Sequence, residues 1–137
     1  ATTDIYTLSL HDSLPISCSF DFRYMRSDRG FICFPEVDLH IPFLPYMDAI
    51  IQRTFPKHLV FKAELTGHRF TATELEACGA VYKACSTPEA TVQEAIAWAK
   101  TLNKSRAIVK TMKNTMNSGI AHLLETVVHP NLDSLGG

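Results

Sequence analysis

Prolines constrain the fold of this chain strongly, because several of them mark places where a helix begins or ends. In a sequence of 137 residues they separate stretches whose apolar residues have helical spacing. Helices are therefore expected to follow Pro45, Pro56 and Pro88, and the last one to stop at Pro130. Short apolar or alternating stretches between these helices predict a few strands. The sequence thus predicts a helix-dominated α/β chain with a few short strands.

Turn and cap residues predict where these elements end. Gly67 suits the left-handed residue that closes a helix, and Thr73 with Glu76 fits a capping box at the start of the next one. Strands are predicted at 20–25, 31–34 and 80–85. Three helices are expected to bury one apolar face each. The face of the helix after Pro45 consists of Met47, Ile50, Ile51 and Thr54, and that of the helix after Pro88 consists of Val92, Ala95, Ile96, Ala99 and Leu102. The face of the last helix consists of Ile108, Met112, Met116, Ile120, Leu123 and Val127.

The first seventeen residues differ from the rest of the chain. They show neither a strand period nor a helix period, and no basic stretch typical of a targeting peptide. Residues 5–12 look like a translated sequencing-adaptor peptide. We therefore expect residues 1–17 to be unstructured or artefactual, residues 18–102 to form a core, and residues 103–137 to form a C-terminal helical segment.

Composition argues against several kinds of partner and site. A formal net charge of −1 gives no reason to expect nucleic acid or an anionic membrane as a partner. No apolar run approaches the ~20 residues that span a bilayer. The histidines lack the spacings typical of metal sites, so no metal is expected. The four cysteines contain no C-x-x-C pair and predict reduced core thiols: Cys18, Cys33, Cys78 and Cys85.

Three separated segments resemble one enzyme family. Residues 22–39, FRYMRSDRGFICFPEVDL, resemble the stretch of eukaryotic enoyl-CoA delta isomerases that carries the catalytic glutamate. Residues 63–72, AELTGHRFTA, are similar to a "Leu-Thr-Gly, basic, then Ala" segment, and residues 74–81, ELEACGAV, resemble the helix and strand that follow it. From 18 to 128 the chain is therefore similar to the C-terminal half of an enoyl-CoA delta isomerase of the enoyl-CoA hydratase/isomerase (crotonase) superfamily.

The resemblance implies a truncated crotonase-like fold, the ββα superhelix of that superfamily. It implies an enzyme of fatty-acid β-oxidation that shifts the double bond of a 3-enoyl-CoA to the 2-trans position, in a peroxisome or mitochondrion. Coenzyme A would enter as part of the substrate, with no separate cofactor. Glu36 takes the catalytic position, and His40 stands where the family commonly has glycine, so the loop after Glu36 is expected to be displaced.

The chemistry of this shift explains why a single glutamate can suffice. A proton must leave C2 and another must reach C4, and one carboxylate within reach of both carbons can do both. The developing enolate oxygen also needs fixed hydrogen-bond donors. In the family these donors come from the half that precedes the matched region, so the chain alone is expected to be inactive.

Other interpretations remain open. An enoyl-CoA hydratase would use two glutamates, the second from the preceding half, and an inactive truncated chain or scaffold would use none. Glu36 itself could be a solvated acid at a strand end, and Asp38 is expected to cap or pair locally.

The last helix carries the basic residues Lys104, Arg106, Lys110 and Lys113, for which a solvated face is the default interpretation. The resemblance places terminal helices near CoA, which makes Lys110 and Lys113 candidates for binding its phosphates. It also implies a homotrimer or hexamer for the full-length protein, assembled through the apolar face from Ile108 to Val127.

Overall fold

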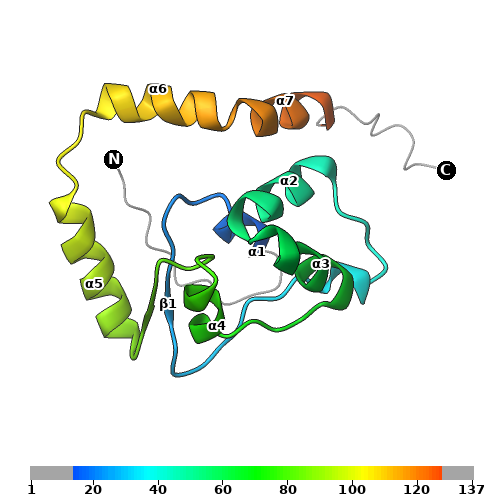
Figure 1. The fold of residues 1–137 in the computed structure, drawn as a ribbon, viewed down its shortest axis with the longest axis horizontal. Coiled ribbons are helices and arrows are strands. Elements are labelled where there is room, and N and C mark those ends of the chain that lie inside the picture. Colours follow the sequence, from blue (N-terminus) through cyan, green and yellow to red (C-terminus); the bar gives the residue numbers. More distant parts are fainter. Residues whose placement is uncertain (1–13, 128–137) are drawn as a thin grey trace, which may run out of the picture.

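The computed structural model describes residues 14–127 and shows a helix-dominated α/β chain with two short strands in that part, as the sequence predicts (Figure 1). Its elements are α1 (Leu14–Ser17), β1 (Tyr24–Arg26), the 3-10 helix η1 (Pro35–Val37), α2 (Pro45–Thr54), α3 (Lys57–Thr66), α4 (Ala72–Ala77), β2 (Lys83–Cys85), α5 (Pro88–Thr101), α6 (Arg106–Met116) and α7 (Ser118–Val127). The prediction for residues 1–13 lies outside the described residues, while 14–17, also predicted to be unstructured, form α1 against α2.

The two strands pair in parallel, with Tyr24 opposite Lys83 and Arg26 opposite Cys85. Parallel neighbours need a long crossover, and here the chain from η1 through α4 supplies it. The strand predicted at 20–25 is confirmed at residues 24 and 25, which belong to β1, and is wrong at 20–23. There the chain turns, and the Arg23 side chain donates to the carbonyls of Phe20 and Ala80. The predicted strand at 31–34 is reduced to one antiparallel bridge between Ile32 and Phe70.

The core lies where α2, α3 and α4 meet the chain that leads into η1. Its most completely buried side chains are spread along the sequence from residue 18 to residue 81: Cys18, Phe34, Ile51, Leu75 and Val81. Helix α2 contributes the face that its periodicity predicts, since Ile50, Ile51 and Thr54 are all buried. The sequence after Cys18 therefore folds around one apolar centre.

The start of α4 differs from its prediction by two residues. Thr71, not Thr73, caps the helix, and its hydroxyl and the Glu74 carboxylate satisfy each other's backbone amides. Both threonines precede a glutamate by three residues, so the spacing alone cannot choose between them. The helix starts after Thr71 because this start places Ala72 and Leu75 in the core. Glu76 instead accepts a hydrogen bond from the backbone of Ala84, at 2.6 Å, beside β2.

The last two predicted apolar faces are less buried than their spacing suggests. On α5 only Ala95 is buried, and Leu102 is 45% exposed. The single long helix expected after Lys104 is two helices, α6 and α7, with Asn117 between them. The Asn117 side chain accepts a hydrogen bond from Arg53 of α2, and Figure 1 shows α6 and α7 end to end along one edge of the molecule.

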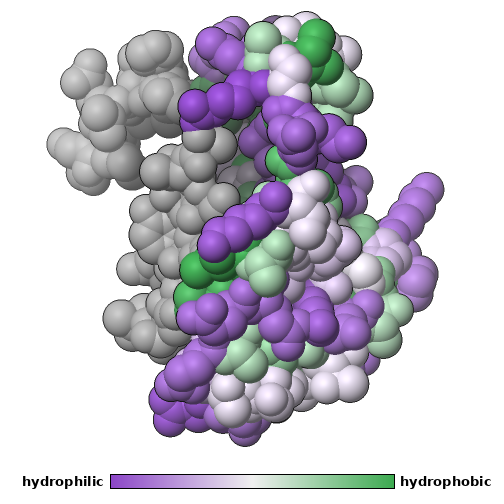
Figure 2. All heavy atoms as spheres, turned by 90° about the vertical axis from the view of Figure 1, so that its left-hand side faces the viewer, coloured by the Kyte–Doolittle hydropathy of each residue, from purple (hydrophilic) through white to green (hydrophobic). Residues whose placement is uncertain are grey.

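Helix α6 leaves a row of apolar side chains exposed. Met112 is 58% exposed and Met116 is 75% exposed, and Ile108 and Val109 belong to the same exposed group. On the face that carries α5, hydrophobic and polar residues alternate without forming one continuous apolar surface (Figure 2). Among the described residues, no helix has the length and apolar character needed to cross a bilayer.

Gly67 fixes how η1 meets α3. As predicted, it ends α3 in the left-handed conformation, with φ of 62°. A Cβ at this position would lie 2.7 Å from the Asp38 carboxylate and 3.8 Å from the Phe34 carbonyl. Since η1 lies between those two residues, the absence of a side chain at Gly67 lets the 3-10 helix pack closely on the end of α3.

We predict that Gly67→Ala destabilises the chain by about 1–2 kcal/mol, because alanine is strained in the left-handed region. Gly119→Ala is the matched control, since Gly119 lies inside α7 and a Cβ there meets no atom within 4 Å. That control should leave stability unchanged or raise it by up to about 1 kcal/mol. Urea unfolding of both variants measures the difference, and equal stability of Gly67→Ala and the wild type would contradict the prediction.

Candidate functional site

Glu36 lies in the middle of η1, between the core and the surface. Phe34, just before η1, is fully buried, whereas Asp38 at its end is exposed. The backbone amides of Asp38 and Leu39 donate to the Pro35 carbonyl at 2.9 and 3.0 Å. The amide of Ile41 donates to the carbonyl of Glu36 at 2.9 Å. These bonds form a tight turn, which fixes the backbone that carries the Glu36 side chain.

The Glu36 side chain is half-buried, and its Oε2 atom is buried without a hydrogen-bond partner. Buried polar atoms nearly always have a partner, and leaving one without costs free energy. The interpretation of Glu36 as a fully solvated acid therefore does not describe this side chain. Its unmet hydrogen-bonding capacity is available to a ligand or to a neighbouring group.

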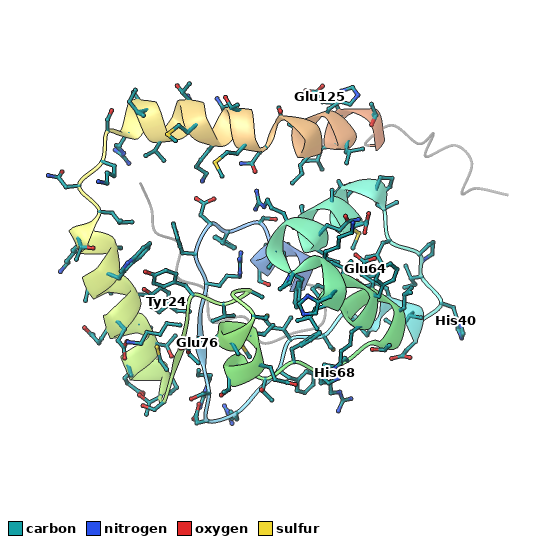
Figure 3. All side chains as sticks on the ribbon, in the orientation of Figure 1. Tyr24, His40, Glu64, His68, Glu76 and Glu125 are labelled. Carbon is teal, nitrogen blue, oxygen red and sulfur yellow. The ribbon has the colours of Figure 1, made fainter. Side chains whose placement is uncertain are left out.

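Two further carboxylates share this region. Glu64 belongs to the last turn of α3, which packs against η1, and Asp48 to the first turn of α2. Figure 3 shows Glu64 where α2 and α3 lie together. The Oε1 atom of Glu64 is also buried without a partner. We call Glu36, Asp48 and Glu64 the carboxylate cluster.

Burial and negative neighbours raise the pKa of Glu64 from 4.5 to about 7. Burial is the largest cause, because it disfavours the charged carboxylate. A hydrogen bond and charge repulsion from Asp48 follow, and repulsion from Glu36 raises the pKa further. Near neutral pH, the carboxyl group of Glu64 is therefore partly protonated, within the cluster that contains the sequence-predicted catalytic residue.

His40, which stands where the family commonly has glycine, has an unusual backbone conformation. It adopts a φ of 57°, a left-handed conformation that glycine accepts without strain and most other residues avoid. Figure 3 shows this residue on the loop at the outer edge of the molecule, beyond η1. The backbone at this position therefore has a conformation that favours glycine, although histidine occupies it.

The structure does not bring the candidate lysines next to Glu36. Lys110 and Lys113 belong to α6, which packs with α7, whereas η1 packs with α3. The ammonium group of Lys113 lies 2.6 Å from the Asp21 carboxylate in an exposed ion pair, which by itself contributes little stability. The assignment of Lys110 and Lys113 to binding of CoA phosphates stays a prediction.

Two grooves on the described surface lie apart from Glu36. One, of about 530 Å³, lies beside α3 and α4 and contains His58, Lys62, Phe70, Glu74 and Cys78 among its lining residues. A second lies along α6 and α7 and includes Lys113 and Glu125. Neither includes Glu36. All four cysteines are free thiols, as predicted, and residues 14–127 hold no group of three His, Cys, Asp or Glu side chains suited to a metal ion.

Sequence reasoning missed Glu64 and Asp48. Glu64 follows Ala63, which is fully buried, and precedes the exposed Leu65, so nothing in the local pattern marks it as inward-facing. The available signal was its place three residues before Gly67, in the helical turn that meets η1. That signal has meaning only once the contact between η1 and α3 is known.

One comparison, with models of protein families, identifies the family. Residues 19–136 match the family model described as enoyl-CoA hydratase/isomerase. The human mitochondrial delta3-delta2-enoyl-CoA isomerase is similar in fold, with a TM-score of 0.70 and 19% identity over 80% of this chain and 43% of that one. ThnE from S. clavuligerus gives a TM-score of 0.68 and 18% identity, over 82% of this chain and 54% of that one.

An enoyl-CoA hydratase from Mycobacterium paratuberculosis gives a TM-score of 0.63 and 13% identity, over 82% of this chain and 54% of that one. The chain therefore spans about half the length of these solved structures. A search of curated proteins gave no significant match. At these identities the structural likeness shows the shared fold.

The raised pKa of Glu64 predicts a pH-dependent stability. A pKa of about 7 in the folded chain against 4.5 means that the folded state holds this proton more tightly. Stability from this group is therefore full below about pH 4.5 and is lost as the pH rises through about 7. One pKa unit corresponds to about 1.4 kcal/mol, and solvent screening at a half-buried site reduces the total. We predict that Glu64→Gln gains about 1–2 kcal/mol over the wild type at pH 8 and almost nothing at pH 5.

Urea unfolding at the two pH values measures this difference. Glu125→Gln, an exposed position on α7, is the control and should behave like the wild type at both. An equal gain for Glu64→Gln at pH 5 and pH 8 would exclude a titration of Glu64 as its cause.

Proposed function

The chain belongs to the enoyl-CoA hydratase/isomerase family, and from that premise we propose that it carries the proton-transferring glutamate of an enoyl-CoA isomerase. The substrate is a 3-enoyl-CoA, whose double bond moves to the 2-trans position, a step of fatty-acid β-oxidation. Glu36 takes the proton from C2 and returns one to C4. The observation that carries this proposal is the buried, unpartnered Oε2 atom of Glu36 on a rigid turn beside the core.

The position of Glu36 suits proton transfer between two carbons. The buried Oε2 atom of Glu36 makes no hydrogen bond within the protein, so it is available to accept a proton from the substrate. The turn from Pro35 to Asp38 and the fully buried Phe34 hold that carboxylate still, so proton removal and delivery need little rearrangement. Coenzyme A takes part only as the substrate's carrier group, and no separate cofactor is needed for this reaction.

The developing enolate oxygen would be held by donors outside this chain. In the family resemblance these donors are two backbone amides from the half that precedes the matched region, and the solved relatives are about twice as long as their matched part. We therefore assign to this chain the base and its support, and to the whole protein the stabilisation of the thioester oxygen.

Hydration of a 2-enoyl-CoA is the second candidate function. A hydratase is among the solved structures with this fold, so the fold alone supports both reactions. A hydratase uses one glutamate to activate water and another to deliver a proton. The isomerase assignment rests on the resemblance of residues 22–39, and the reaction product decides between the two.

Glu36→Gln tests the proposed base in a full-length protein that contains this chain. Glutamine keeps the shape of the side chain but cannot accept a proton, so kcat with a 3-enoyl-CoA should fall about 10²- to 10⁴-fold. The measurement is formation of the 2-trans-enoyl thioester by absorbance, with chromatography to detect any hydroxyacyl product of hydration.

Asp38→Asn is the matched control, because it removes a neighbouring charge at an exposed position and should leave kcat nearly unchanged. Full activity of Glu36→Gln would refute the base. A hydroxyacyl product in place of the shifted double bond would favour the hydratase.

Assembly through α6 is part of the same proposal. Its exposed Ile108, Met112 and Met116 form an apolar row that another copy of the chain would cover in a homotrimer or hexamer. Lys110 and Lys113, on the same helix, would then lie where CoA phosphates could reach them, and this role also belongs to the proposal.

Met112→Glu is expected to break that assembly, because it places a charge in the middle of the apolar row. Asn114→Glu adds the same charge about half a helical turn away and is the control. Light scattering of the full-length protein should show an oligomer for the wild type and for Asn114→Glu, and smaller particles for Met112→Glu. A monomeric wild type would contradict the proposed assembly.

A further inference from the structure

We propose that the loop after Glu36 forms one wall of the site that holds the acyl chain of the substrate, and that Leu39 and Ile41 give the whole protein a preference for longer chains. This inference rests on the function proposed above, and it concerns the part of the substrate beyond the shifted double bond. We call Val37, Leu39, Ile41 and Leu44 the apolar loop face.

The apolar loop face is exposed although all its members are large and aliphatic. Val37 is 40% exposed and Leu44 43%, while Leu39 and Ile41 reach 58% and 56%. Asp38, which lies between two of them in the chain, turns instead toward the end of α3. Figure 1 shows their segment as the cyan loop that leads to α2, at the outer edge of the molecule. Single exposed apolar side chains are common, whereas a group of them typically marks a surface that binds another molecule.

Hydrogen bonds fix the backbone of the first half of this loop. The amide of Leu39 donates to the Pro35 carbonyl at 3.0 Å. The amide of Ile41 donates to the Glu36 carbonyl at 2.9 Å, so Ile41 and the proposed base are in direct backbone contact. Pro42 follows Ile41 and restricts it to extended conformations. The apolar loop face therefore begins directly beside the residue that performs the reaction.

Phe43 anchors the second half of the loop in the core. Its ring packs edge-on against that of the fully buried Phe34, with the ring centroids 6.3 Å apart. Leu44 has an extended backbone, with a ψ of 151°, and Pro45 then starts α2. The loop thus presents its aliphatic side chains from a fixed backbone, which lowers the entropy cost of binding an apolar chain.

The reaction places the acyl chain beside this loop. The carboxylate of Glu36 must reach both C2 and C4, so both carbons lie close to η1 in the bound substrate. The remaining carbons begin one bond beyond C4, and they must therefore run over the side chains that surround Glu36. Burying this hydrocarbon against the apolar loop face removes apolar surface of both from water, which favours binding.

Other exposed apolar residues are placed less well for this role. The apolar row of α6 belongs to a helix that packs with α7, and Leu102 lies at the end of α5, which packs with the two strands. Neither of the two grooves described above includes Glu36. We therefore assign one wall of the acyl site to this chain and its other walls to the rest of the whole protein.

The chain-length dependence of kcat/KM in the full-length protein tests this wall. Each methylene that leaves water should raise kcat/KM about two- to fourfold, so the value for 3-decenoyl-CoA should exceed that for 3-hexenoyl-CoA about 10- to 100-fold. Leu39→Asn and Ile41→Thr nearly keep the size of the side chain but make the face polar, so each should lower this ratio about three- to tenfold. Leu102→Asn is the matched control at an exposed position on the end of α5, and it should leave the ratio unchanged.

Binding of saturated acyl-CoAs tests the same wall without the reaction. Hexanoyl-CoA and decanoyl-CoA have no double bond to shift, and titration calorimetry measures their Kd directly. The wild type should bind decanoyl-CoA about 10- to 100-fold more tightly than hexanoyl-CoA, and Leu39→Asn should remove most of that difference. Equal affinity of the wild type for the two compounds would overturn the inference.

The remaining outcomes separate this inference from the proposed function. An active wild type with equal kcat/KM for the two chain lengths would overturn the inference and leave the proposed function standing. Chain-length-dependent binding that Leu39→Asn weakens, in a wild type that does not isomerise a 3-enoyl-CoA, would support the wall and overturn the proposed function.

Protein is the alternative occupant of the apolar loop face, either a second copy or the half that precedes the matched region. In that case Leu39→Asn would dissociate the oligomer or lower the unfolding midpoint, and the chain-length ratio would stay at the wild-type value. Light scattering and unfolding curves of the same variants detect this result, which would overturn the inference.

Discussion

The packing of η1 on the end of α3 is the constraint on which the candidate site depends. It requires a residue without a side chain at Gly67, because Asp38 and the Phe34 carbonyl come close to that position. It also requires Phe34 in the core, where the side chain fixes the start of η1. With both in place, Glu36 is half-buried on a turn closed by its own backbone hydrogen bonds. A loop free of α3 would leave the same glutamate in water.

Much of this arrangement follows from local sequence signals. The helix starts after Pro45, Pro56 and Pro88 and the left-handed end at Gly67 are where the sequence predicts them, because these residues restrict the backbone wherever they occur. A sequence signal that occurs at two neighbouring positions predicts a helix start less reliably. Two threonines precede glutamates at capping-box spacing, and only the burial of Ala72 and Leu75 decides for Thr71. Local propensity proposes such a boundary, and tertiary packing selects it.

The candidate site was only half accessible from the sequence, for a related reason. Glu36 could be found because its flanking residues form a recognisable segment. Glu64 could not be found in this way, since its position near Glu36 results from the contact between α3 and η1, two elements that lie apart in the chain. The long apolar pattern after Lys104 shows a second limit of sequence analysis, which concerns burial. Its period predicts amphipathic helices correctly, but period alone does not say whether the apolar face meets the chain's own core, and in α6 it stays exposed.

The free-energy cost of Glu64 supports a functional interpretation of the cluster. A carboxyl group with a buried, unpartnered oxygen destabilises the fold, and two negative neighbours increase that cost. Its place in the last turn of α3 adds an unfavourable interaction with the helix dipole, where a basic residue would stabilise. Leucine or glutamine would avoid these costs without disturbing Gly67 or η1. Residues that lower stability in this way are typical of sites where chemistry, not folding, determines the side chain.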